Sequence, residues 1–293
     1  MSNKSFSDIK ISVIIPTYNR KLFLFKAIES VFKQSEPVDE VIVVDNNSDD
    51  GTQYFIRKKF PMVKVLNIQK RNVSIARNLG IKEAKFDWIA FLDSDDQWNK
   101  NKIREQKKKL IASGGKLKFI HTDELWFKDN KHFNQSLKHK KKEGDLFKNC
   151  LNFCTISPSS VIIYREIFFK YGFFNDRLPV CEDYELWIKF SSKVEIGLIK
   201  KALVYKYGGH SDQLSRRYWG IDRFRVRALE KIYFYFELSD YQKILILDTI
   251  IKKSYILTTG AAKRNNLKIS RIYNFKINYW TKKKKLINRS YAL

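Results

Sequence analysis

The chain has 293 residues, of which 44% are hydrophobic and 15% aromatic. This composition predicts a folded globular protein and excludes a disordered or low-complexity chain. Its 57 basic and 31 acidic residues give a net charge of +26. Such an excess favours anionic partners, namely nucleotide phosphates, nucleic acid or an anionic membrane surface, and does not choose among them.

Neither a signal peptide nor a membrane-spanning helix is predicted. Residues 1–10 are polar, and the best apolar run, Ile244 to Leu247, is broken by Asp248. The three cysteines are an odd number without metal-ligand spacing, which indicates reduced thiols. We therefore expect a cytoplasmic protein that is soluble or peripheral on the inner face of the cell membrane.

Two buried strands open the chain. Residues 11–15 form an apolar run that we expect to end at Pro16, because proline has no N–H for a ladder. A helix over residues 21–34 and a second apolar run over 40–44 follow. Strand, helix and strand in this order predict a right-handed crossover and a parallel pair.

The same alternation continues with a strand over residues 62–66, a helix over 73–84 and a strand over 88–92. It predicts a doubly wound α/β fold with a mostly parallel sheet. Further expected elements are a helix over 97–112, a strand over 117–121, an exposed basic loop over 128–143, a strand over 160–164, helices over 165–171 and 183–192, and a strand over 194–199.

Strand signals stop after Gly209, and helical periodicity covers residues 221–236, 240–262 and 269–278. We therefore predict an α/β domain over 1–215 and a helical appendage over 216–293. The appendage holds 19 basic and 5 acidic residues with interleaved aromatic residues. Its helices could lie on an anionic bilayer, or pack their aromatic side chains on the first domain with lysines facing water; both interpretations stay open.

Acidic side chains follow two of the predicted strands. Asp93, Asp95 and Asp96 come at the end of the strand over 88–92, and Asp45 ends the strand over 40–44. Ligands bind at the carboxyl ends of parallel strands in open α/β sheets. Closely spaced carboxylates repel one another unless they share a cation. The alternative is that these acids cap helices and turns.

Five motifs carry a family resemblance. They are Ser12-Val13-Ile14-Ile15-Pro16-Thr17-Tyr18-Asn19-Arg20; Val43-Val44-Asp45 with Ser48-Asp49-Asp50-Gly51-Thr52; Ser74-Ile75-Ala76-Arg77-Asn78-Leu79-Gly80; Phe91-Leu92-Asp93-Ser94-Asp95-Asp96; and Glu182-Asp183-Tyr184-Glu185-Leu186-Trp187. In this order and spacing they resemble a family 2 glycosyltransferase with the A-type nucleotide-sugar fold, over roughly residues 10 to 215. The Asn46-Asn47 pair departs from the commoner Asp-Asp-Gly-Ser form of the second motif.

The resemblance implies transfer of a hexosyl or N-acetylhexosaminyl group from a nucleotide-diphosphate sugar, with a UDP-sugar favoured. The implied acceptor is a hydroxyl of a bacterial surface glycan or its lipid-linked precursor. Asp45 is implied to accept the ring N–H of uracil. The implied nucleotide-sugar-binding residues are Pro16, Thr17, Tyr18, Asn19, Asp45, Arg77, Asp93 and Ser94.

The same resemblance implies a Mn²⁺ or Mg²⁺ cofactor. Its ligands would be Asp95, with Asp93 and His210 as further contacts. Carboxylate oxygens suit these hard cations, and a bound diphosphate supplies oxygens of its own. A cation there would neutralise charge that develops on the leaving phosphate.

An inverting transfer also needs a base to take the proton of the acceptor hydroxyl. The resemblance gives this role to Asp183, with Glu182 as the alternate; simple capping of the following helix is the competing interpretation.

Two other functions are alternatives to glycosyl transfer. A non-catalytic nucleotide-sugar-binding protein would share the fold, although Asp95 and Asp183 argue against it. A nucleic-acid-binding protein is suggested by charge alone. No base-reading or stacking motif supports it, so no nucleic-acid partner is expected.

Overall fold

The computed structural model describes residues 5–129, 131–136, 139–209 and 218–291. The chain divides into two compact units, which are described separately. The first comprises residues 1–146, 155–176 and 193–210, and the second comprises residues 147–154, 177–192 and 211–293. The helical region predicted over residues 216–293 falls in the second unit. The second unit also includes residues 147–154 and 177–192, which the sequence analysis had assigned to the first domain.

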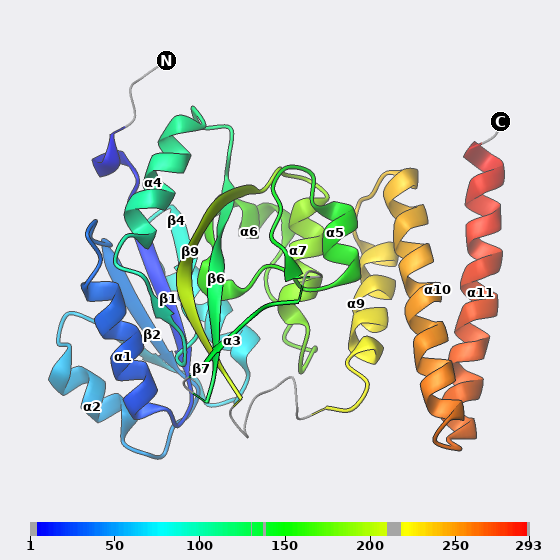
Figure 1. Cartoon of the computed structure of the whole chain (residues 1–293), viewed down its shortest axis with the longest axis horizontal. Helices are drawn as coiled ribbons and strands as arrows, with labels where there is room; N and C mark the ends of the chain where they lie inside the picture. The colour runs from blue at the N-terminus through cyan, green and yellow to red at the C-terminus, as the bar shows by residue number, and fades with distance from the viewer. Residues whose placement is uncertain (1–4, 130, 137–138, 210–217, 292–293) are drawn as a thin grey trace. The chain divides into compact units, whose positions relative to one another are not determined.

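The first unit is built on one mixed sheet of nine described strands (Figure 1). Their order is β3-β2-β1-β4-β8-β6-β9-β5, with β7 paired to β6. The strands are β1 (Ile11–Thr17), β2 (Glu40–Asp45), β3 (Lys64–Asn67), β4 (Trp88–Phe91), β5 (Gln97–Trp98), β6 (Phe119–Lys128), β7 (Lys131–Phe133), β8 (Ile162–Tyr164) and β9 (Gly197–Gly208). The neighbours β3, β2, β1 and β4 run parallel. The predicted α/β class with a mostly parallel sheet and C-terminal helices is confirmed.

Helices of the first unit cover both faces of this sheet. They are α1 (Lys21–Phe32), α2 (Thr52–Lys59), α3 (Val73–Glu83), α4 (Lys102–Ala112) and α6 (Glu166–Tyr171). Val13 and Ile15 of β1 share a core cluster with Leu24 of α1, whereas Ile14 faces Gly80 of α3. Successive side chains of a strand point to opposite faces. This explains why β1 reads as a continuous apolar run.

Two predicted boundaries were wrong for reasons of strand pairing. β1 continues through Pro16 to Thr17, where β2 is its neighbour, while its register with β4 ends at the Ile14–Phe91 pair. Proline is tolerated at such a one-sided position. The helix predicted from Gln97 begins only at Lys102, because residues 97–98 pair with β9 as β5. Pairing with a distant strand overrides local helical periodicity here.

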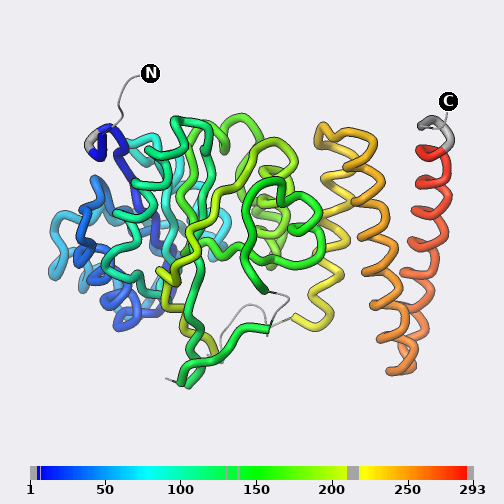
Figure 2. The backbone as a smooth tube through the Cα atoms, turned by 45° about the horizontal axis from the view of Figure 1, so that its top comes forward, coloured from blue at the N-terminus to red at the C-terminus, as the bar shows by residue number. Residues whose placement is uncertain are grey.

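The second unit consists of helices: α5 (Phe147–Asn152), α7 (Glu182–Ser191), α9 (Asp222–Tyr235), α10 (Asp240–Ala262) and α11 (Leu267–Tyr291). Ser239 caps α10 with its side chain, and Gln242 returns the bond in a capping box. The Lys253 ammonium joins three of these helices, because it donates to the Asn152 carbonyl and to Asp222. Helices α10 and α11 pack side by side (Figure 2). Among the described residues, no helix is long and apolar enough to cross a bilayer.

Gly80 offers a test of the packing of α3 on β1. A Cβ added there would lie 2.4 Å from Cγ2 of the buried Ile14. Gly80→Ala is therefore expected to destabilise the fold by about 1–3 kcal/mol, although alanine normally stabilises a helix interior. Gly208→Ala is the control, because its nearest neighbour would be 4.0 Å away. Denaturant unfolding measures both, and a stabilised Gly80→Ala protein would contradict this packing.

Candidate functional site

The end of β4 places three carboxylates in one short turn of the first unit. The amide of Asp96 donates to the carbonyl of Asp93 at 2.9 Å, which closes the turn. The Asp93 and Asp95 side chains are 24% and 17% exposed, whereas Asp96 is 1% exposed. Two of the three acids are therefore open to a ligand, and the third is part of the core.

Arginines from two different elements neutralise the open carboxylates. Arg77 of α3 donates to Asp93 at 2.8 Å, and its own side chain is 5% exposed. Arg20, just before α1, forms an ion pair with Asp95. The structure thus brings together Asp93, Asp95 and Arg77, three of the predicted site residues. The sequence interpretation did not single out Arg20, although it directly follows the predicted nucleotide loop.

Asp96 holds the turn against the neighbouring strands. It accepts hydrogen bonds from the Ser159 hydroxyl at 2.6 Å, the Lys206 ammonium at 3.3 Å and the Tyr207 amide at 3.2 Å. Burial raises the pKa of Asp96 to about 7; Lys206 opposes this rise, and the other two acids of the turn add to it. Burial alone would lower the pKa of Lys206. The nearby carboxylates of Asp96 and Asp93 raise this pKa instead, so the ammonium stays charged.

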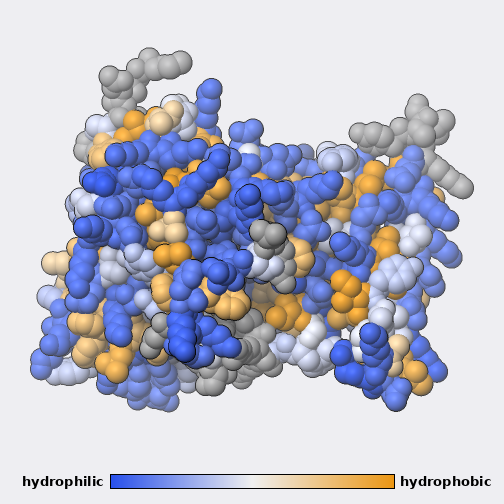
Figure 3. Space-filling model, in the orientation of Figure 1, coloured by the Kyte–Doolittle hydropathy of each residue, from blue (hydrophilic) through white to orange (hydrophobic). Residues whose placement is uncertain are grey.

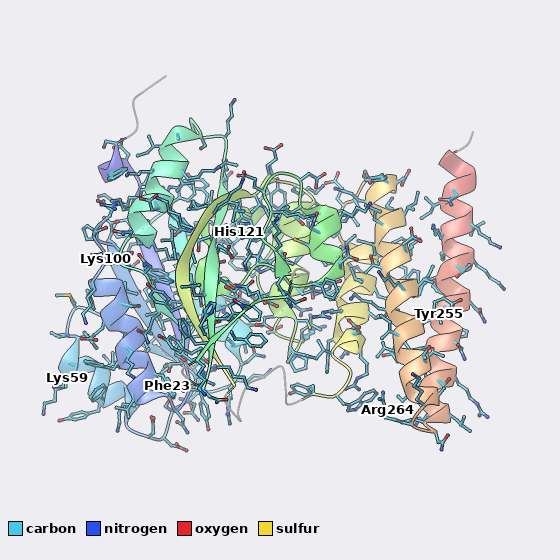
Figure 4. All side chains as sticks on the ribbon, in the orientation of Figure 1. Phe23, Lys59, Lys100, His121, Tyr255 and Arg264 are labelled. Carbon is cyan, nitrogen blue, oxygen red and sulfur yellow. The ribbon has the colours of Figure 1, made fainter. Side chains whose placement is uncertain are left out.

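A second cluster of buried charges lies beside this turn. Glu124 of β6 pairs with Lys141 at 3.3 Å, and both side chains are at most 4% exposed. Burial alone would raise the pKa of Glu124, but the positive charges of Lys141 and Lys206 lower this pKa to about 2. Lys141 belongs to the loop that was predicted to be exposed. For this residue the prediction was wrong, because a buried acid draws the lysine inward. His121, labelled in Figure 4, also lies on β6. Burial lowers its pKa to about 4.

The loops after β1 and β2 are tied together where the nucleotide is predicted to bind. The backbone N–H of Asn19 donates to the Ser48 hydroxyl at 2.9 Å. The Asn19 side chain donates to the Asp49 carboxylate and accepts from the Asp49 backbone N–H. The Arg71 guanidinium lies 3.4 Å from the ring centroid of Tyr18, in a cation–π contact. Pro16 and Thr17 are the last two residues of β1, directly before this loop, and Ser94 is buried in the acidic turn.

Asp45 is fully buried at the end of β2. Its carboxylate accepts hydrogen bonds from the Ser48 amide, the Ser48 hydroxyl and the Gln53 side chain at 3.1, 2.5 and 2.7 Å. A carboxylate has about four acceptor positions, and these hydrogen bonds occupy three of those of Asp45. The uracil contact of Asp45 stays a prediction, and the observed contacts show that Asp45 also organises its own loop.

The predicted base lies in the second unit, at the start of α7. Asp183 accepts a hydrogen bond from the Tyr184 amide at 2.7 Å and one from the Cys154 thiol at 3.1 Å. The preceding Cys181 has a left-handed backbone with φ of 66°, and Glu182 is 7% exposed. Such a backbone conformation costs free energy for a residue other than glycine and often accompanies functional sites. The thiol partner of Asp183 had no signal in the sequence.

The residues present fit a divalent cation only together with a ligand. Within the described ranges, no group of three or more His, Cys, Asp or Glu side chains is arranged to hold a metal ion. Asp95 and Asp93 offer hard oxygen donors, and both are paired with arginine. Mg²⁺ and Mn²⁺ commonly take one or two carboxylates plus phosphate oxygens and water. His210, the third predicted ligand, lies outside the described residues.

A family model described as "Glycosyl transferase family 2" matches residues 12–170. An uncharacterized glycosyltransferase of Rickettsia conorii is 34% identical over 205 residues, which is 69% of this chain and 33% of that protein. The chain thus spans about a third of the length of that relative. The UDP-Glc:alpha-D-GlcNAc-diphosphoundecaprenol beta-1,3-glucosyltransferase WfaP of Escherichia coli is 30% identical over 196 residues, covering 62% of this chain and 70% of WfaP.

Among solved structures, the chain is similar to residues 1–349 of S. aureus TarS in complex with UDP-GlcNAc. The TM-score is 0.64 at 18% identity, and the match covers 92% of each chain. At this identity the likeness concerns the fold. It agrees with the α/β architecture described above.

Proposed function

Because the chain belongs to glycosyltransferase family 2, we propose that it is an inverting, cation-dependent enzyme that uses a UDP-sugar. The observation that carries the proposal is the pair of open carboxylates at the carboxyl end of β4, Asp93 and Asp95, each faced by an arginine. This is the edge of an α/β sheet where ligands bind. Arginine side chains beside carboxylates suit a ligand that carries phosphates together with a coordinated metal ion: the arginines can bind the phosphates and the carboxylates the metal.

The donor and acceptor are inferred from chemistry and from relatives. Arg20, Arg77 and Lys206 supply positive charge around the acidic turn, and guanidinium groups bind phosphate oxygens in bidentate fashion. By its name WfaP uses UDP-Glc and a diphosphoundecaprenol-linked acceptor, and TarS was crystallised with UDP-GlcNAc. A UDP-hexose or UDP-N-acetylhexosamine as donor and a surface-glycan or lipid-linked acceptor are therefore proposed, with the reaction in the cytoplasm.

The residues have distinct proposed roles. Asp95 and Asp93 would hold Mn²⁺ or Mg²⁺, which supplies charge neutralisation to the leaving diphosphate. The loop of Tyr18 and Asn19 would cradle the base. Asp183 would take the acceptor proton, with Glu182 as the alternate.

A donor screen by thermal shift tests the function. Each nucleotide sugar is added with Mn²⁺ or with EDTA, and the melting temperature is read. A ligand at a hundred times its Kd stabilises a fold by about 2.7 kcal/mol. UDP-sugars with Mn²⁺ are expected to give the largest shift. No shift with any nucleotide sugar would refute the proposal, and a shift without turnover on any acceptor would instead support a non-catalytic binding protein.

Cys154 gives a finer test of the proposed base. Burial, and then the Asp183 carboxylate, raise the pKa of the Cys154 thiol well above its usual value. The thiol therefore stays protonated and donates to Asp183. Cys154→Ala removes this hydrogen bond, which helps to hold the Asp183 carboxylate at the start of α7. We expect kcat to fall about two- to tenfold while UDP binding is unchanged, because the lost hydrogen bond is worth about 0.5–1.5 kcal/mol.

Cys154→Ser is the matched variant, because its hydroxyl can still donate to Asp183 and should restore kcat. An equally low kcat in Cys154→Ala and Cys154→Ser would mean that the thiol only fills space.

A further inference from the structure

We propose that the outer face of α11 is a docking surface for an anionic membrane. Four apolar residues form a stripe along this helix: Ile272, Phe275, Tyr279 and Leu286. Their exposed fractions are 43%, 71%, 39% and 59%. At about 100° per residue they lie within about 60° of one another around the helix axis. Figure 3 shows apolar patches set among hydrophilic surface over the C-terminal helices.

The stripe is separate from the face by which α11 packs in its own unit. That inner face carries Tyr273, Ile277 and Trp280, which are at most 7% exposed. The Trp280 indole donates to Glu230 of α9 at 3.0 Å, and Lys284 pairs with Asp248 of α10. The inner contacts thus account for the attachment of α11, and they leave the stripe directed away from the unit.

The charge of α11 selects the kind of partner. The helix contains eight lysines and arginines and no acidic residue. Lys268, Lys282 and Lys285 are exposed around the stripe. An apolar stripe with basic residues beside it suits the boundary between anionic headgroups and acyl chains. A second copy would bring an equally basic α11 against the first, and such like charges repel.

The surface would hold the enzyme where a lipid-linked acceptor is found. The proposal does not rest on the donor or the base, because membrane binding requires neither. Its failure would therefore leave the proposed transfer reaction untouched. Conversely, a membrane-bound protein without transferase activity would leave the docking surface standing.

Co-sedimentation of the full chain with lipid vesicles is the test. The wild-type protein is expected to bind phosphatidylglycerol vesicles at least about tenfold more tightly than phosphatidylcholine vesicles, and to release them at high salt. The combined change Ile272→Ser, Phe275→Ser and Tyr279→Ser should weaken binding at least about tenfold. Changing Lys268, Lys282 and Lys285 to Ala should weaken it about a hundredfold. This second variant keeps Lys276 and Lys284, which pair with Glu230 and Asp248.

Tyr54→Ser is the matched control, because Tyr54 is as exposed as Phe275 and also lies beside a lysine, yet belongs to α2. It should bind vesicles like the wild type, and all variants should keep the wild-type melting temperature. Equal vesicle binding by wild type and both α11 variants would overturn the proposal. So would a dimer that only the stripe variant loses, or salt-sensitive binding to DNA in place of vesicles.

Discussion

Asp183→Asn is expected to bind UDP as the wild-type protein does and to transfer sugar about 10²- to 10⁴-fold more slowly. The amide keeps the shape of the side chain, and its oxygen can still accept from the Tyr184 amide that Asp183 now contacts. What it loses is the ability to take a proton from an acceptor hydroxyl. Binding is measured by titration with UDP and Mn²⁺, and transfer by release of UDP.

Glu182→Gln is the companion variant, because Glu182 is the neighbouring carboxylate at the start of α7. If Asp183 is the base, Glu182→Gln should retain transfer within about tenfold. An active Asp183→Asn protein beside an inactive Glu182→Gln protein would move the base to Glu182. Normal transfer by both would show that neither residue is the base.

The strands and the acidic turn were predictable because they follow from general rules. Strands buried on both faces read as apolar runs, and the carboxyl ends of parallel strands meet at one edge of a sheet. These rules place Asp45 and Asp95 at one edge without any knowledge of side-chain contacts. They also explain why the short strand β5 was missed, since its pairing with β9 is not encoded locally.

The partners of those acids could not be read from the chain. Arg20 and Lys206 lie 75 and 110 residues from the carboxylates they contact, and no periodicity links such positions. Lys141 looked like one more solvated lysine in a basic run, yet it is buried against Glu124. In a sequence with so many lysines, composition cannot separate the few that neutralise buried acids from the many that face water. The length of α11 was underestimated for a similar reason, because Lys282 to Lys285 break the apolar periodicity of the helix.

Asp95→Ala is expected to weaken UDP binding in the presence of Mn²⁺ by about ten- to hundredfold. With EDTA the same variant should bind UDP as well as the wild type or slightly better, because no cation is then present for Asp95 to hold and its carboxylate no longer repels the diphosphate. The two conditions therefore separate a lost metal ligand from a damaged fold, which would weaken binding in both.

Asp87→Ala is the control for Asp95→Ala, because this exposed acid lies just before β4, at the opposite end of the strand. It changes the net charge by the same amount and should leave the response to Mn²⁺ intact. Isothermal titration with UDP measures all three proteins with and without the cation. If Mn²⁺ still strengthens UDP binding to Asp95→Ala, the carboxylate is not a metal ligand, and its ion pair with Arg20 is instead a structural contact of the nucleotide loop.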